Sequence, residues 1–326
     1  MKILIIRFSS IGDIVLTTSV VRCVKEQVKN AEIHFLTKEI FFPVLEANPY
    51  INKIHLLHES EREMIRELKN EKFDLIIDLH HNIRSLRVKV ALGVESRTFN
   101  KINFDKWMMV NFKINGMPSI HIVDRYFETV KSLGVKNDGK GSDYFISITD
   151  VVEMHSLPLM VSQGYVAFVI GAKHFTKRLP VKKITEICKL INKPIILLGG
   201  KEDQKAGEEI AANSEYHAWS ACGLYNINQS ASLIRQAISV ITHDTGLMHI
   251  AAAFNKKILS IWGNTIPEFG MYPYLPSGNN GSEIMEVSGL NCRPCSKLGF
   301  EKCPQKHFNC MNLISNKKIA DWANEN

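Results

Sequence analysis

A short polar loop follows the first apolar run of the chain and carries groups that could hold a ligand. Residues 6–19, "IRFSSIGDIVLTTS", begin as a buried strand and continue as a helix, and the loop between them is Ser9-Ser10-Ile11-Gly12-Asp13. Gly12 permits a tight turn, and the serine hydroxyls can cap the helix or bind a ligand group. Asp13 adds a carboxylate, although an acid in the first turn of a helix is favourable without any function.

A second loop, "HDTGLMHIAAAF" at residues 243–254, has the same position between an apolar strand and a helix. Asp244-Thr245-Gly246 at a helix start offers free backbone N–H groups and a positive dipole end, which suit a diphosphate. His249 follows one turn later and could point to the same place. A buried histidine with satisfied hydrogen bonds is the alternative for that residue.

Two further loops carry charged groups directly after predicted strands. "GAKHFTKRLP" (171–180) brings Lys173, Lys177 and Arg178 close to the expected phosphate. "GGKED" (199–203) contains Glu202 and Asp203, either of which could reach ribose hydroxyls as acids do in nucleotide-binding folds.

The elements that must position these loops alternate between apolar strands and amphipathic helices, which is typical of parallel βαβ units and predicts an α/β fold. Polar, glycine-containing residues 136–164 interrupt the alternation, so we predict two domains, 1–150 and 151–326. Ligands of such sheets bind beyond the carboxyl ends of the strands, so the loops should line a cleft between two doubly wound units. The predicted strands are 2–8, 32–37, 53–57, 73–79, 96–100, 165–172, 193–200, 217–222, 238–244 and 257–263, and the predicted helices include 121–135, 181–191, 203–213, 228–237, 246–255 and 315–324.

Composition narrows the class of protein. The 326 residues are 45% hydrophobic and 22% charged, as in ordinary globular proteins. Neither a signal peptide nor the roughly 18–20-residue apolar run of a membrane span is apparent, which predicts a cytoplasmic protein. Neither unit has G-x-G-x-x-G after its first strand, which disfavours a nicotinamide or flavin oxidoreductase, and there is no P-loop motif.

The net charge of +7 suits an anionic partner, and basic residues gather in one segment. Residues 84–113 contain Arg84, Arg87, Lys89, Arg97, Lys101, Lys106 and Lys113 against Glu95 and Asp105. This segment is either a solvated face or a site for phosphate and carboxylate groups. Residues 286–314, which contain the cysteine cluster, have little more basic charge than the rest of the chain, so nucleic-acid binding by this segment is poorly supported.

Four of the seven cysteines lie near the C-terminus as C-x₂-C-x₇-C-x₆-C, at Cys292, Cys295, Cys303 and Cys310. The first pair has the spacing of zinc ligands, and His307 is a further candidate ligand. The later spacings differ from those of a standard zinc ribbon. A structural zinc site, reduced thiols packing a loop, and a disulfide or redox pair all remain open.

Several stretches resemble one family in content and order. "MKILIIRFSSIGDIVLTTSVVRCVKE", "LIIDLHHNIRSL", "HIVDRYFETVKSLGV", "THDTGLMHIAAAFNKKILSIWGNT" and "CRPCS" are similar to those of ADP-heptose:lipopolysaccharide heptosyltransferases, glycosyltransferase family nine, over nearly the whole chain. The resemblance implies the GT-B fold, in which two Rossmann-like domains face each other across a cleft. It also implies an inverting, metal-independent transfer of heptose from ADP-heptose to a lipopolysaccharide or lipooligosaccharide core acceptor, without a required cofactor.

The resemblance also implies roles for individual residues. Asp13 matches the general base, Lys177 a lysine that contacts the donor diphosphate, and Glu202, less securely, a ribose-binding acid. The donor loop corresponds to Asp244, Thr245, Gly246 and His249, and the acceptor side to Ser9, Ser10, Arg84, Ser85, His121 and Arg125. The chain departs from the family at Leu179, where an aromatic residue is usual, and at Ala172-Lys173, where some members have hydroxyl residues.

The implied partners are a nucleotide sugar and a core glycolipid, with peripheral contact to the inner face of the cytoplasmic membrane. One alternative is a GT-B enzyme that uses another nucleotide sugar. Another is a noncatalytic nucleotide-sugar-binding protein, which would not need both Asp13 and Lys177.

Overall fold

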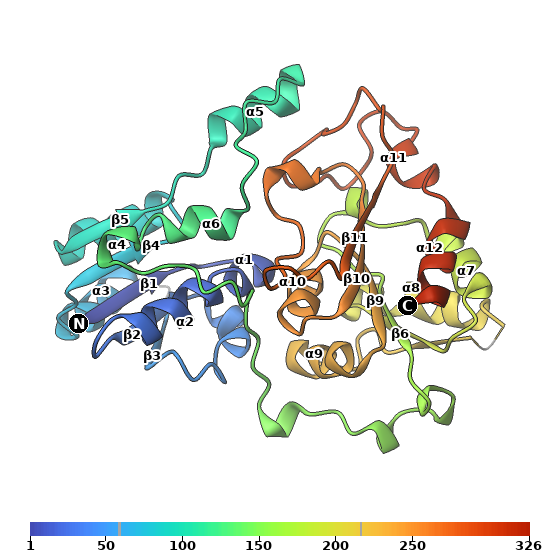
Figure 1. The fold of residues 1–326 in the computed structure, drawn as a ribbon, viewed down its shortest axis with the longest axis horizontal. Helices are drawn as coiled ribbons and strands as arrows, with labels where there is room; N and C mark the ends of the chain where they lie inside the picture. The colour runs from blue at the N-terminus through green and yellow to red at the C-terminus, as the bar shows by residue number, and fades with distance from the viewer. Residues whose placement is uncertain (58–59, 216) are drawn as a thin grey trace. The chain divides into compact units, whose positions relative to one another are not determined.

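The computed structural model describes residues 1–57, 60–215 and 217–326. The chain divides into two compact units, the first formed by residues 1–101 and 120–145 and the second by 102–119 and 146–326 (Figure 1). The change near residue 145 lies inside the predicted linker. Within the described residues, no helix combines the length and apolar character needed to cross a membrane.

The first unit is built on a five-stranded parallel sheet in the order β3-β2-β1-β4-β5. Ile3, Leu4, Ile5 and Ile6 of the central strand are fully buried, as expected for a parallel strand covered on both faces. The strands are β1 (Lys2–Ile6), β2 (Glu32–Thr37), β3 (Lys53–Leu56), β4 (Leu75–Asp78) and β5 (Glu95–Thr98).

Helices of the first unit pack on this sheet, and their apolar side chains complete the hydrophobic core. On one face, Met64 and Leu68 of α3 and Val88 of α4 pack with Leu4 and Leu36 of the sheet. The helices are α1 (Ile11–Val15), α2 (Thr18–Gln27), α3 (Glu61–Asn70), α4 (Ile83–Leu92) and α6 (Ile122–Phe127), with 3₁₀ turns η1 (Glu39–Val44) and η2 (Lys131–Leu133). The helix predicted at 121–135 is therefore shorter than expected.

The second unit has a six-stranded parallel sheet in the order β11-β10-β9-β6-β7-β8. Its strands are β6 (Val166–Val169), β7 (Ile195–Leu198), β8 (Ala218–Ser220), β9 (Ser239–His243), β10 (Lys257–Trp262) and β11 (Ser282–Glu286). Strand β11 is absent from the predicted strands.

Alternate residues of β6 enter two separate cores, as the period of a strand requires. Val166 and Phe168 pack on the side of α7 and α12, whereas Ala167 and Val169 pack on the side of α9 and α10. The helices are α7 (Val181–Leu190), α8 (Gln204–Ala212), α9 (Ile227–Gln236), α10 (Gly246–Ala253), α11 (Asn309–Asn312) and α12 (Asn316–Glu325). The 3₁₀ turns are η3 (Ile148–Asp150), η4 (Met154–Ser156), η5 (Leu159–Val161), η6 (Phe175–Lys177), η7 (Lys201–Asp203) and η8 (Pro267–Phe269).

Helix α5 (Asn103–Phe112) belongs to the second unit although it lies within the sequence range predicted for the first domain. Met109, Val110 and Met117 pack against Ile266 and Phe269 of the second unit. This grouping follows from long-range apolar contacts, which no local pattern in residues 102–119 reveals.

The strand orders define one topological switch point in each sheet. Chain order runs outward from β1 to β2 and β3, then resumes on the other side of β1 with β4 and β5. The second sheet changes direction in the same way between β6 and β9. Parallel sheets bind ligands at the carboxyl ends of the strands at such points. The loops that start at Ser9 and Asp244 therefore follow strands that border these points.

Candidate functional site

In the first unit, Asp13 lies in the first turn of α1, directly after β1. The Ser10 backbone N–H and hydroxyl both donate to Asp13 Oδ2, at 3.0 and 2.7 Å. Ser10 is the N-cap of α1 and forms a capping box with Asp13. The Arg7 guanidinium forms an ion pair with Asp13 Oδ1. The side chain keeps 21% of its surface exposed, so the fixed carboxylate remains accessible.

Arg7 is a site residue that sequence reasoning missed. It is buried, donates from Nε to the Ser9 carbonyl oxygen at 2.8 Å, and donates from Nη1 to the Tyr126 hydroxyl at 3.2 Å. It also bonds to the carbonyl oxygen of Leu79, after β4. Arg7 thus ties the loop after β1 to the loop after β4. The signal available in the sequence was a basic residue directly before a polar loop at a strand end.

Asp78, at the carboxyl end of β4, organises the start of α4. Its Oδ1 accepts the His81 N–H at 2.8 Å, and its Oδ2 accepts the Ser85 hydroxyl at 2.8 Å and pairs with Lys89 at 3.0 Å. Burial would raise the pKa of Asp78, but these donors outweigh it and lower the pKa. Ser85 is completely buried and serves this network, whereas Arg84 beside it is exposed.

The other two residues expected on the acceptor side, His121 and Arg125, are mostly buried in the first unit. His121 is the N-cap of α6, and its Nδ1 accepts the Val123 N–H at 3.1 Å. Arg125 donates to the Asn100 carbonyl oxygen at 3.4 Å. Ser9 is half-buried and Ser10 is exposed beside Asp13. Of the residues expected on the acceptor side, Ser9 and Ser10 therefore lie in the same loop as Asp13. His121 lies at the start of α6 and Arg125 within it, and both are mostly buried.

In the second unit, Lys177 and Asp244 meet directly. Lys177 lies at the end of η6, and its Nζ donates to Asp244 Oδ2 at 2.6 Å. Thr265, after β10, donates its hydroxyl to the same oxygen at 2.9 Å. The loops after three adjacent strands, β6, β9 and β10, are joined at one carboxylate.

Helix α10 begins beside this cluster with Thr245 as its N-cap and Gly246 as its first residue. Thr245 does not cap the helix with its side chain, and its buried hydroxyl has no hydrogen-bond partner among residues 1–57, 60–215 and 217–326. His249 is buried within α10. A helix start with an unused hydroxyl donor, next to a lysine, is suited to binding an anion.

Asn264 adds a group that sequence reasoning missed. It follows β10, is 1% exposed, and neither its amide oxygen nor its amide nitrogen has a partner in the described part of the chain. An unsatisfied buried polar group costs about 1–3 kcal/mol, so such a side chain calls for a functional explanation. The pattern "WGNT" directly after a strand was the only sequence signal.

Glu202 is exposed on η7, at the carboxyl end of β7, and Lys173 is exposed after β6. Arg178, from the loop after β6, pairs with buried Asp203 of η7 at 2.9 Å. Burial raises the pKa of Asp203 despite this partner. A Cβ at Gly171 would come within 2.1 Å of Asp203 Oδ2, so glycine is required for this close approach.

The four C-terminal cysteines are unpaired, and Cys292 Sγ lies 3.9 Å from His307 Nε2. Burial raises the pKa of Cys295 to about 11 and of Cys310 to about 12, which favours protonated thiols. In the described chain, no three of these ligand atoms lie within 4.8 Å of one another. Cys310 is buried in the core of the second unit, and Cys303 packs against that core.

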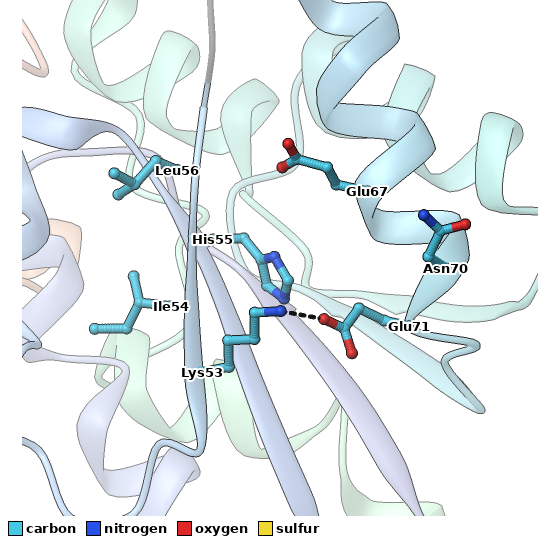
Figure 2. A pocket seen from close by; sticks show the side chains of 7 residues that line it. All are labelled: Lys53, Ile54, His55, Leu56, Glu67, Asn70 and Glu71. Carbon is cyan, nitrogen blue, oxygen red and sulfur yellow. Dashed lines mark hydrogen bonds and ion pairs between the residues drawn. The ribbon is translucent and has the colours of Figure 1, made fainter.

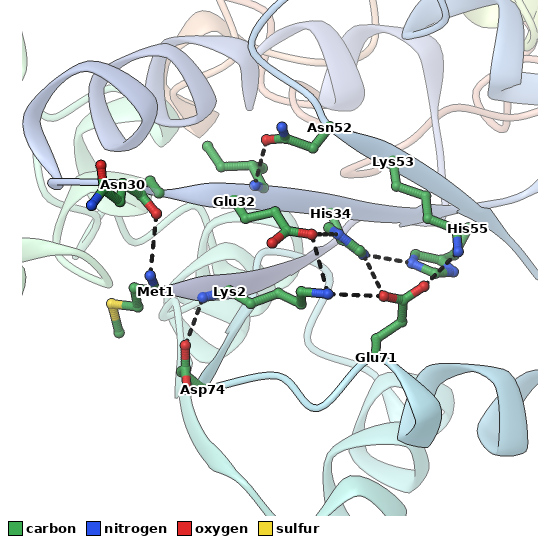
Figure 3. Close-up of polar contacts among 12 residues, drawn as sticks. Met1, Lys2, Asn30, Glu32, His34, Asn52, Lys53, His55, Glu71 and Asp74 are labelled. Carbon is green, nitrogen blue, oxygen red and sulfur yellow. Dashed lines mark hydrogen bonds and ion pairs between the residues drawn. The ribbon is translucent and has the colours of Figure 1, made fainter.

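A separate polar cluster in the first unit has ligand-like spacing, because atoms of His34, His55 and Glu71 lie within 4.8 Å of one another. Figure 3 shows that it already forms a continuous network: His34 Nδ1 contacts His55 Nε2 at 2.9 Å, and Lys2 pairs with Glu71 at 3.0 Å and with Glu32 at 3.1 Å. The amino-terminal residues of β1 take part, whereas Asp13 follows the carboxyl end of that strand.

Lys53 also pairs with Glu71 at the edge of an open hollow of about 420 Å³ (Figure 2). The Lys53 bond, followed by that from Lys2, lowers the pKa of Glu71 to about 2. The carboxylate is therefore balanced by two ammonium groups, and these residues are satisfied without a metal ion.

Solved structures share this fold. A glycosyl transferase family 9 structure from Veillonella parvula DSM 2008 has a TM-score of 0.78, with 18% identity, and covers 99% of this chain and 96% of that chain. The E. coli heptosyltransferase WaaC with ADP has a TM-score of 0.69, with 17% identity, and covers 100% of this chain and 99% of that one. The fold is the GT-B fold of nucleotide-sugar glycosyltransferases, as expected.

Similarity to proteins of known sequence identifies the family within this fold. Lipopolysaccharide heptosyltransferase 2 of Escherichia coli (strain K12) is 24% identical over 294 residues, which cover 82% of this chain and 84% of that protein. Residues 61–300 match the family described as "Glycosyltransferase family 9 (heptosyltransferase)". The chain belongs to glycosyltransferase family 9 and is a glycosyltransferase.

Proposed function

We propose that the protein transfers a heptose from ADP-heptose to a lipopolysaccharide or lipooligosaccharide core acceptor with inversion at the anomeric carbon. The observation that carries this proposal is the anion-binding arrangement of the second unit: Lys177 held by Asp244 beside the open start of α10. Support for the donor comes from similar E. coli WaaC structures, which contain ADP and ADP-2-deoxy-2-fluoro heptose.

On the donor side, the leaving ADP gains negative charge as the bond to the sugar breaks. Lys177 and the N–H groups at the start of α10 stabilise this charge as preorganised donors. The unused Thr245 hydroxyl and the Asn264 amide supply further polar contacts to the donor. Lys173 and Glu202, exposed at the same edge of the sheet, would bind phosphate and ribose, respectively. No step of this proposal uses a divalent cation or another cofactor.

On the acceptor side, Asp13 acts as the general base. An acceptor hydroxyl is a weak nucleophile, and removing its proton during attack contributes about 10²–10⁴-fold to the rate. Arg7 and Ser10 hold the carboxylate at an accessible position, so it needs no rearrangement before accepting a proton. Attack opposite to the leaving group inverts the anomeric centre.

Arg84 binds the acceptor's carboxylate or phosphate groups in this proposal, because it is exposed and a guanidinium binds such groups in a bidentate manner. Ser85 acts by fixing the first turn of α4, from which Arg84 extends. His121 and Arg125 contribute to acceptor binding indirectly, by holding α6 in place: His121 caps the helix, and Arg125 bonds to the Asn100 carbonyl oxygen. A glycolipid acceptor also implies that the protein works in the cytoplasm, at the inner face of the membrane.

A donor panel tests the proposed substrate. ADP-heptose, other ADP-sugars and UDP-hexoses are incubated with intact and dephosphorylated core acceptors, and products are identified by mass spectrometry and NMR. We expect transfer from ADP-heptose to exceed transfer from each other donor. Preferred transfer of a hexose or N-acetylhexosamine would contradict the donor assignment, and nucleotide-sugar binding without transfer would indicate a binding protein.

A further inference from the structure

Helix α5 presents an aromatic face to solvent. Phe104 is 70% exposed, Trp107 51% and Phe112 58%, and no residue of the helix is buried. Phe104 stacks on Trp107 with ring centroids 6.2 Å apart, and Trp107 contacts Phe112 edge to face at 5.4 Å. The three rings form one contiguous surface. Such surfaces on a soluble domain mark interaction sites more often than scattered apolar residues do.

A different face of α5 attaches it to the second unit. Met109 and Val110 pack against Ile266 and Phe269, and the Lys106 ammonium lies 5.7 Å from the Phe269 ring centroid. At 100° per residue, these positions centre on the side of the helix opposite Phe104, which Trp107 and Phe112 flank. The exposed rings are therefore not needed to hold α5 in place.

The cysteine-rich segment extends this surface. Its residues Leu298 and Phe300 are exposed, and Phe300 helps α5 line an open pocket of about 320 Å³. Lys106 and Lys297 line the same pocket. Lys113, at the end of α5, donates to the Pro294 carbonyl oxygen at 2.7 Å, a neutral acceptor that leaves its positive charge in place.

We propose that this docking surface, formed by Phe104, Trp107, Phe112 and Phe300 with Lys113 and Lys297, binds the protein to an anionic lipid bilayer. Aromatic rings partition into the headgroup region, and nearby lysines are attracted by anionic lipids. The choice of a bilayer rests on the combination of rings with positive charge and on the proposed function, whose acceptor is a glycolipid. Docking would bring the enzyme to its acceptor.

Vesicle flotation tests this inference. The full chain is mixed with vesicles of phosphatidylethanolamine and phosphatidylglycerol or with vesicles of phosphatidylcholine alone. We expect binding to the anionic vesicles that weakens with salt. The triple variant Phe104→Ser/Trp107→Ser/Phe112→Ser should lose on the order of tenfold or more in partitioning. Lys297→Glu should lose roughly fivefold or more.

Matched controls separate this surface from general effects of apolarity and charge. Ile148→Ser/Leu159→Ser removes two exposed apolar side chains elsewhere in the second unit, and Lys205→Glu reverses an exposed charge on α8. Both should bind vesicles like the parent protein. Circular dichroism and thermal unfolding check that each variant is folded.

Several outcomes would overturn the inference: no binding of the parent protein to anionic vesicles, equal binding by the triple variant, or concentration-dependent dimerisation through these rings with no vesicle binding. Transfer assays keep this test separate from the proposed function. The triple variant should retain transfer to an acyl-free core oligosaccharide and lose transfer to acceptor embedded in vesicles. Flotation without any transfer would contradict the proposed function and leave docking supported.

Discussion

Arg7 and Lys177 play similar parts at the two catalytic positions we propose, because each holds a carboxylate with a charged hydrogen bond. Their consequences differ. Arg7 fixes Asp13, whose carboxylate must meet the acceptor. Lys177 is itself the group that must meet the donor, so Asp244 keeps its ammonium in position until the diphosphate arrives and competes for it. Thr265, which donates to the same Asp244 oxygen, stabilises the carboxylate during that exchange.

Arg84 offers a direct test of acceptor recognition. Replacing it in Arg84→Ala removes a bidentate donor, so we expect the acceptor KM to rise by about tenfold or more while the donor KM changes little. Steady-state kinetics with each substrate varied in turn measures both values. Arg87→Ala is the matched control, because Arg87 is exposed on the same helix and already pairs with Glu61 at 3.4 Å. Equal rises in both KM values would refute the assignment of Arg84.

Replacing Asn264 tests whether this buried side chain binds the donor or only packs inside the second unit. Asn264→Ala removes an unsatisfied buried group and leaves a small cavity, so the free energy of unfolding should rise or fall by no more than about 1 kcal/mol. Donor affinity should fall at the same time. Urea unfolding and titration with ADP measure the two effects. A loss of stability with unchanged ADP affinity would identify Asn264 as a packing residue.

Buried histidines at strand ends link the stability of the sheets to pH. Burial lowers the pKa of His55 on β3 and of His80 after β4 to about 4, and that of His243 on β9 to about 3. In the unfolded chain these imidazoles titrate near their ordinary pKa of about 6.5. Unfolding below that pH therefore takes up protons.

The free energy of unfolding should fall as the pH drops from about 6.5 to about 5, by up to about 1.4 kcal/mol per pH unit for each of these histidines. Urea unfolding across this range measures the slope. His55→Gln should make the slope shallower, since it removes one group that gains a proton on unfolding. A free energy of unfolding that is flat or rises as the solution is acidified would contradict this account.

Most elements could be predicted from the sequence because they have an apolar signature. The run Ile3–Ile6 identified β1 because both faces of a central parallel strand are buried. Strand β11 escaped prediction because Ser282–Glu286 is largely exposed and pairs only at the edge of the sheet. The loop positions of Asp13 and Asp244 followed from strand ends, whereas their partners Arg7 and Thr265 required the folded chain.

For the whole molecule, the two-part organisation was predictable because the alternation of strands and helices stops and restarts. That residues 102–119 belong to the second unit could not be predicted, because it depends on Met109 and Val110 packing against residues more than a hundred positions later in the chain. The chain therefore passes from the first unit to the second and back before residue 145. This path puts the docking surface of α5 on the unit that carries the proposed donor site.

The role of Asp13 as the general base is the central claim, and Asp13→Asn tests it most directly. The substitution keeps the size of the side chain and removes its ability to accept a proton. We predict that transfer from ADP-heptose falls by about 10²-fold or more, while ADP binding measured by calorimetry is unchanged. Asp321→Asn, an exposed change on α12, should behave like the parent protein. Transfer by Asp13→Asn at the rate of the parent protein would contradict the account.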